Sequence, residues 1–304
     1  MITPHLKVAF FAAAISLAGC RLGQPAGEFQ PITLDATEVT GKVDYSGLAA
    51  VLKAGIGPGG KLLPEKLKAN AKMLEGQLML MAVAGPKSSA DLFEGENSKL
   101  NYWYNARAAW SLRLVLTFSR ERLESESETS KADEEETRQA VRWRIEDDGV
   151  PIEEFRNRPF PIDGRSMTLA LMDSLIAEEF GFKAVVGAPG VSPARAEIPT
   201  RPFNTNDAAG LIDERFNDFI DDEKRFVIDV PSKRILVPPV LWRFGERLIA
   251  DHQQQYRVTG ANLTTALLPH VRLSPHRRLQ DAVGYRCIQA PQPKAPLIVK
   301  RQDD

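Results

Sequence analysis

Apolar residues recur at every third or fourth position in several stretches of this 304-residue chain, and this spacing predicts amphipathic helices. One stretch begins at Pro64, which suits a first helical turn, and its apolar positions are Leu67, Ala71, Leu74, Leu78 and Met81. Similar patterns cover residues 43–53, 100–118, 166–180, 206–220, 240–256 and 263–271. Because each amphipathic helix has an apolar face to bury, these helices must share a core.

Strict alternation of apolar and polar residues predicts strands elsewhere. Apolar residues alternate with arginines over residues 141–145, and residues 225–238 alternate on both sides of a Pro-Ser-Lys turn, which predicts a hairpin. A further short strand is expected at residues 183–186. We therefore predict an α+β fold, in which helices pack on a small, mostly antiparallel sheet within a single large domain.

The first residues of the chain predict export. A weakly basic start is followed by the apolar residues Val8 to Leu17. At a rise of about 1.5 Å per residue this run is too short to cross a hydrocarbon core of about 30 Å. A basic start, a short apolar segment and small residues at its end are typical of a secretory signal.

The apolar run ends in Leu17-Ala18-Gly19-Cys20, which resembles the lipobox of bacterial lipoproteins. The resemblance implies diacylglycerol on the Cys20 sulfur, cleavage between Gly19 and Cys20, and acylation of the new amino terminus. The alternative is an ordinary signal peptide in which Cys20 is incidental. Arg21 stands where an inner-membrane retention signal would place Asp. We therefore expect Cys20 to hold the protein on a lipid bilayer, the outer membrane, facing the periplasm.

These observations divide the chain into four segments. We expect a signal peptide at residues 1–19, a lipidated N-terminus with a flexible linker at residues 20–42, the folded domain at residues 43–289 and a C-terminal tail at residues 290–304. Within the domain, residues 121–138 are rich in Glu, Ser and Lys, which favours a solvated excursion or a mobile loop.

Composition argues against several classes of partner and cofactor. The 39 basic and 40 acidic residues nearly cancel, so no net field attracts nucleic acid. With Cys20 acylated, Cys287 is the one thiol left, so folding depends on an apolar core rather than on disulfides. The glycine cluster at residues 55–60 lacks the Gly-Lys-Ser/Thr ending of a phosphate-binding loop and predicts a turn. His270 and His276 have no neighbours in a metal-ligand pattern, so we expect neither a metal nor a cofactor.

Several short motifs follow one another in a characteristic order. They are Val43-Asp44-Tyr45-Ser46-Gly47-Leu48, then Tyr104-Asn105-Ala106 at the start of a long helix, then residues 207–220, the hairpin ending at Pro238, and Trp242 in a helix. In this order they resemble the domain of unknown function 547 family, which is found in bacteria and plants. The resemblance covers roughly residues 43–289 and rests on the ordered set rather than on any single motif.

The chain departs from this family at the positions that carry chemistry. Family members have a His on a strand, followed by a loop with two cysteines, the second before a proline. Here Phe182 stands at the position of the His, Gly187 at the first Cys, and Ser192, before Pro193, at the second. The family's Tyr-Asp-Trp signature is reduced to Tyr-Arg-Cys at residues 285–287. The resemblance therefore implies that any thiol or imidazole chemistry of the family is lost.

Ser192 is a weak candidate for a nucleophile in place of the cysteine. A serine hydroxyl needs a positioned base, commonly a histidine. After the signal peptide the chain offers His252, His270 and His276, and nothing in the sequence brings any of them to Ser192. Because serine is also common in turns, the Gly-Val-Ser-Pro loop favours a structural role.

Tyr102, Trp103, Tyr104 and Asn105 form the most unusual local composition. They allow two interpretations. Either the aromatic rings pack into the core while Asn105 bonds to backbone, which we favour, or the four residues line a cleft for a peptide or a sugar.

The functional prediction is a non-catalytic binding or structural domain in the cell envelope, with an envelope protein or polymer as its partner. The alternative is a hydrolase or transferase acting on envelope peptide or glycan, with Ser192 and a distant histidine as its working pair. A hydrogen bond between the two would require an imidazole within ~3.2 Å of the Ser192 hydroxyl.

Overall fold

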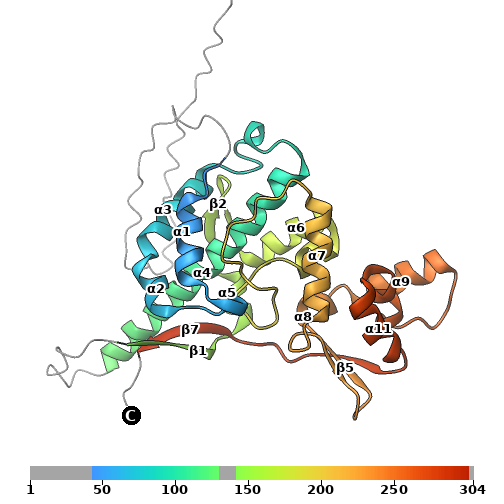
Figure 1. Ribbon diagram of the computed structural model, residues 1–304. Helices are drawn as coiled ribbons and strands as arrows, with labels where there is room; N and C mark the ends of the chain where they lie inside the picture. Colours follow the sequence, from blue (N-terminus) through green and yellow to red (C-terminus); the bar gives the residue numbers. More distant parts are fainter. Residues whose placement is uncertain (1–42, 130–141, 301–304) are drawn as a thin grey trace, which may run out of the picture. The chain divides into compact units, whose positions relative to one another are not determined.

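The computed structural model describes residues 43–129 and 142–300 (Figure 1). The predicted cleavage site at Gly19, the lipidation site Cys20 and the linker lie outside the described residues. In chain order the α-helices are α1 (Ser46–Gly55), α2 (Pro64–Ala69), α3 (Ala71–Val83), α4 (Gly95–Thr129), α5 (Ile152–Asn157), α6 (Leu169–Val186), α7 (Ala208–Asp221), α8 (Pro239–Trp242), α9 (Gly245–Tyr256), α10 (Leu263–Leu267) and α11 (Leu273–Asp281). None of the helices described is both long enough and apolar enough to cross a membrane.

The strands form three small sheets. β1 (Trp143–Val150) pairs antiparallel with β7 (Ala295–Lys300), and β2 (Phe160–Ile162) pairs antiparallel with β3 (Arg165–Met167). In the third sheet β5 (Arg234–Val237) lies between β4 (Val227–Asp229), to which it is antiparallel, and β6 (Arg286–Gln289), to which it is parallel. The predicted α+β fold with mostly antiparallel pairing is confirmed, although the strands are divided among separate small sheets.

Helix α4 occupies the centre of the core. Every residue from Leu100 to Leu112 is buried, and α3, α6, α7 and β7 all pack against this helix. A helix covered on every side carries apolar residues all around its axis. This explains why the sequence of α4 is dense in aromatics and alanine rather than striped.

Several predicted elements are confirmed. The glycine cluster at residues 55–60 ends in a single 3-10 turn at Pro58–Gly60. The hairpin predicted at residues 225–238 is formed by β4 and β5, and Trp143 to Ile145 belong to β1 as expected. Val141 lies outside the described residues.

The long helix predicted from Pro64 to Met81 is instead two helices, because the Asn70 side chain donates to the Lys66 carbonyl at 2.8 Å and ends α2.

The region around α6 differs from the prediction in two ways. Residues 183–186, expected as a strand, belong to a short helical segment that follows a break in α6 at Gly181 (φ 82°, ψ 177°), and they are largely buried. Ser166 and Met167, expected in the helix, belong to β3. The helix begins at Leu169, because Thr168 is its N-cap and the Thr168 hydroxyl accepts a hydrogen bond from the Leu171 amide. A short apolar run has no periodicity that separates a strand from a buried helical turn.

The other two differences lie at the edges of the domain. Helix α4 continues to Thr129, so the first part of the excursion expected at residues 121–138 is helical. The segment expected as a tail from residue 290 contains β7, in which Ala295 to Ile298 are buried. The amide of Ile298 donates to the Ser119 hydroxyl of α4 at 2.7 Å, so β7 is part of the folded domain.

Candidate anion-binding site

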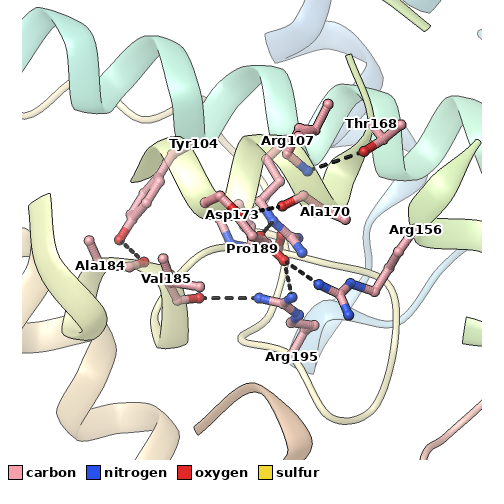
Figure 2. Close-up of polar contacts among 12 residues, drawn as sticks. Tyr104, Arg107, Arg156, Thr168, Ala170, Asp173, Ala184, Val185, Pro189 and Arg195 are labelled. Atoms are coloured by element: carbon pink, nitrogen blue, oxygen red, sulfur yellow. Dashed lines mark hydrogen bonds and ion pairs between the residues drawn. The ribbon is translucent and has the colours of Figure 1, made fainter. Parts of the chain in front are cut away.

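Asp173 is the centre of the most highly charged site in the described part of the chain. Its side chain is fully buried on α6. Arg107 Nε donates to Asp173 Oδ1 at 2.8 Å, and Arg195 Nη2 donates to Oδ2. Figure 2 shows Arg107, Arg156 and Arg195 reaching the same carboxylate from different directions. One carboxylate therefore holds several guanidinium groups.

Two further arginines approach the same oxygen from the solvent side. Arg156 Nη2 lies 3.4 Å and Arg243 Nη2 lies 3.6 Å from Asp173 Oδ2. Arg156 is on α5, and Arg243 follows α8. Because the arginines come from separate elements, the tertiary fold fixes their arrangement.

Backbone contacts fix the two innermost arginines. Arg107 Nη1 donates to the Pro189 carbonyl, and Arg195 Nη1 donates to the Val185 carbonyl at 3.2 Å. A Cβ atom added at Gly190 would lie 2.8 Å from Arg107 Nη1, so the loop after α6 approaches this guanidinium too closely for a side chain. This explains the glycine of the Pro189-Gly190 loop.

The pKa values of the group reflect both burial and an excess of positive charge. Burial alone would raise the pKa of Asp173, but Arg107, Arg195 and Arg243 hold it well below its usual range. Burial, followed by repulsion from Arg107, lowers the pKa of Arg195. Burial also lowers the pKa of Arg243, and Asp173 is the acid that opposes this shift for both arginines. Arginine nevertheless stays protonated, so the group keeps its positive charge.

A cavity of about 250 Å³ opens beside the group, and we name it the arginine pocket. Arg156, Arg195 and Arg243 are its charged lining residues, and no acidic residue lines it. Its remaining lining residues, apolar or uncharged, are Ile152, Ser192, Ala194, Pro239, Val240, Trp242, Gln289, Gln292 and Pro293. Three cations around one small cavity, with their shared carboxylate behind them, form a site suited to an anion.

Ser192 lines the arginine pocket, but its surroundings are those of a turn residue. Its hydroxyl accepts from the Ala194 amide at 3.3 Å, and its carbonyl accepts from the Arg195 amide at 2.9 Å. No histidine lines this cavity. His252 and His270 line a different one, where the ring of His270 lies 5.2 Å from that of Phe182. The structure thus places Ser192 near arginines, and its catalytic assignment stays a prediction without support from a nearby base.

Tyr102, Trp103, Tyr104 and Asn105 belong to the core rather than to a cleft. All four are buried, with exposed fractions of 0 to 3%. The hydroxyl of Tyr102 donates to the Met81 carbonyl at 2.8 Å, and that of Tyr104 donates to the Ala184 carbonyl at 2.7 Å. None of the four lines the cavity of about 980 Å³ to which their neighbours Tyr45, Phe93 and Asn101 contribute. The structure supports core packing for these residues.

Asn105 belongs to a ladder of three asparagines spaced by four residues along α4. Asn105 exchanges two hydrogen bonds with the backbone of Phe203, at 2.7 and 2.9 Å. Asn101 does the same with Thr205, at 2.9 Å in both directions. Asn97 bonds to the Asn206 carbonyl at 2.8 Å and to the Ala208 amide at 2.7 Å. Through these hydrogen bonds the asparagine side chains of α4 hold the backbone of residues 203–208 against the helix.

Sequence reasoning missed the residues that form the charged site. The apolar spacing over residues 166–180 predicts a helix but does not identify its buried face, since Leu171 is 55% exposed and Leu175 is half-buried. The buried face is Leu169, Met172, Asp173 and Ile176. The available signal was a single carboxylate among apolar residues at helical spacing, since a charge on a buried face requires a partner.

Other predicted positions carry less chemistry. A Cβ atom added at Gly187, where the family has its first cysteine, would lie 2.7 Å from the Cβ atom of Arg215, so this backbone leaves no room for that side chain. Cys287 is a free thiol, and its sulfur lies 3.3 Å from the Thr264 hydroxyl. Within residues 43–129 and 142–300, no cluster of three or more His, Cys, Asp or Glu is placed to hold a metal ion.

No family model, no curated protein and no solved structure matches this chain. Its resemblance to the domain of unknown function 547 family therefore stays a prediction from the sequence.

Proposed function

We propose that this chain is an exported, lipid-anchored protein of the cell envelope whose folded domain binds an anionic ligand in the arginine pocket. The anchor is the acylated Cys20, and the membrane is the outer membrane on its periplasmic side. The domain acts by binding rather than by catalysis.

The observation that carries this proposal is the excess of positive charge. The guanidiniums of Arg107, Arg156, Arg195 and Arg243 all lie within 3.6 Å of the Asp173 carboxylate. Among the described residues, Glu153 is the one further acid in contact with any of them, 3.6 Å from Arg156, and it is largely exposed. Partly buried cations without counter-charges are costly, and a bound anion offsets that cost.

Binding fits the site better than catalysis does. Guanidinium groups match carboxylate and phosphate oxygens and cannot act as bases, because they stay protonated. Ser192 also lines the pocket, but no histidine is among the lining residues, so its hydroxyl lacks a neighbouring base there. Recognition of an anion uses every charged group present there.

The proposal is tested by thermal unfolding of the full-length protein in detergent, with inorganic phosphate as the probe and chloride as the reference at equal ionic strength. Because a ligand that binds only the folded state stabilises it, phosphate at ten times its Kd should add about 1.4 kcal/mol and raise the Tm. Arg243→Gln, which removes one lining guanidinium, should lose most of this gain.

The matched control is Arg247→Gln, at an exposed arginine on α9 paired with Asp251. Phosphate also stabilises proteins through its exclusion from their surface, so the difference between these variants decides the outcome. The same phosphate response in the wild type and in Arg243→Gln would overturn the proposed site.

A further inference from the structure

The arginine pocket has more charge to neutralise than one monoanion supplies. Four guanidiniums face two carboxylates, Asp173 and the exposed Glu153, which leaves an excess of two positive charges. A bound carboxylate would leave one of these charges without a partner. A dianion would balance both.

The donors around the pocket also suit a group with several acceptor oxygens. Arg156, Arg195 and Arg243 line it from three separate parts of the chain. Arg243 contacts Asp173 through Nη2, and its Nε and Nη1 make no hydrogen bond or ion pair with the residues that the structure describes. A phosphate presents three acceptor oxygens in a tetrahedral arrangement, whereas a carboxylate presents two in one plane.

The pocket also has apolar lining residues, which a bare ion would leave uncovered. Its lining also includes Trp242, Val240, Pro239 and Ile152, and Trp242 is 37% exposed although it is a large apolar side chain. A cavity of about 250 Å³ has room for several waters at about 30 Å³ each, and therefore for more than one small group. A ligand with an organic part beside its anionic group would cover these apolar side chains.

We propose that the ligand of the arginine pocket is a phosphomonoester bound as its dianion, with the phosphate between Arg156, Arg195 and Arg243 and the organic part against Trp242. This inference rests on the proposed function and names the chemical class of its ligand. The phosphomonoester is the head group of a lipid or belongs to a soluble sugar phosphate, and the experiment below separates these sources.

The dianion gives the binding a characteristic pH dependence. The second pKa of a phosphomonoester is about 6, so the dianion falls from nearly all of the ligand at pH 7.5 to about one tenth at pH 5. Guanidinium groups in proteins stay protonated over this range, and the depressed pKa keeps Asp173 ionised. Glu153 faces Arg156 from outside the pocket. Affinity should therefore fall about tenfold between pH 7.5 and pH 5.

The experiment is calorimetric titration of the full-length protein in detergent with four ligands. Glucose 6-phosphate and dihexanoyl phosphatidic acid are the soluble and the lipid phosphomonoester. Glucuronate and dihexanoyl phosphatidylglycerol are their monoanionic counterparts. We expect at least one phosphomonoester to bind about tenfold or more tightly than its counterpart at pH 7.5, and its affinity to fall about tenfold at pH 5 while that of glucuronate stays constant. The tighter of the two phosphomonoesters identifies the source.

Trp242→Ala tests the placement of the organic part. It should weaken the tighter phosphomonoester about fivefold or more and leave inorganic phosphate unchanged. An unchanged affinity for the ester would overturn that placement. Equal binding of the monoanions and the phosphomonoesters would overturn the inference while the proposed anion site stands. Failure of all four ligands and of inorganic phosphate would overturn both.

Discussion

At the scale of single residues, Asp173 determines whether four arginines can share one small volume. Removing one partner of a buried charge cluster leaves the others uncompensated, at a cost of about 3–5 kcal/mol. Asp173→Asn keeps the shape of the side chain and removes its charge. We expect it to lower the free energy of unfolding at pH 7 by this amount in urea denaturation. Glu153→Gln, at an exposed partner of Arg156, is the control and should cost less than about 1 kcal/mol.

The same substitution predicts how stability depends on pH. The pKa of Asp173 is lower in the folded than in the unfolded protein, so its contribution is present above the unfolded value of about 3.9 and is lost as the pH falls toward the folded value. The difference in unfolding free energy between the wild type and Asp173→Asn should be constant from pH 7 to about pH 5 and shrink below about pH 4. A difference that grows on acidification would contradict this account.

The asparagine ladder gives a second prediction for single residues. Asn105→Ala leaves the buried amide and carbonyl of Phe203 without partners, at about 1–3 kcal/mol for each group. We expect Asn105→Ala to destabilise the protein by about 2–6 kcal/mol in urea unfolding. Asn97→Ala, at the more exposed end of the ladder, should cost about 1 kcal/mol. Equal effects of the two substitutions would show that burial does not set the strength of the ladder.

Sequence patterns predict little of the site at this scale, and the reason is physical. A residue's charge is visible in the sequence, but its burial depends on elements far away along the chain. Arg107 and Asp173 are 66 residues apart, and Arg243 lies still later in the chain, after α8. The glycine at position 190 is likewise explained by a guanidinium on α4 that local sequence does not reveal.

At the scale of elements, β7 extends the domain beyond the expected boundary. It pairs with β1, and its residues Leu297 and Ile298 are buried. A chain ending at Pro293 should lose about 3–6 kcal/mol of stability, at about 1.5–3 kcal/mol for each of these two side chains, and unfold or aggregate at 37 °C. A chain ending at Lys300 is the matched control and should melt with the wild type. Circular dichroism melting of the two truncations measures the difference.

Elements with a clear period were predictable, and elements without one were not. The hairpin of β4 and β5 shows alternation on both sides of a turn, and α7 has an apolar stripe that includes Phe216, Phe219 and Ile220. Residues 183–186 are almost wholly apolar, so length and position, not pattern, decide that they end a helix. The pairing of β7 with β1 joins segments more than 140 residues apart, which no local pattern encodes.

At the scale of the whole molecule, we propose that a lipid anchor at Cys20 holds a domain whose pocket binds an anion. Cys20→Ser removes the acceptor of the thioether, so the precursor should remain uncleaved between Gly19 and residue 20. Mass spectrometry of the membrane and soluble fractions would measure this directly. A serine variant that is still cleaved at that bond and still carries acyl chains in the membrane fraction would show that the lipobox prediction is wrong.

The central claim, an anion in the arginine pocket, is tested most directly by diffraction from crystals soaked in selenate, a tetrahedral dianion with a strong anomalous signal. We expect an anomalous peak between Arg156, Arg195 and Arg243, and a much weaker one in crystals of Arg243→Gln. Selenate peaks elsewhere on the surface, with an empty pocket in the wild type, would contradict it.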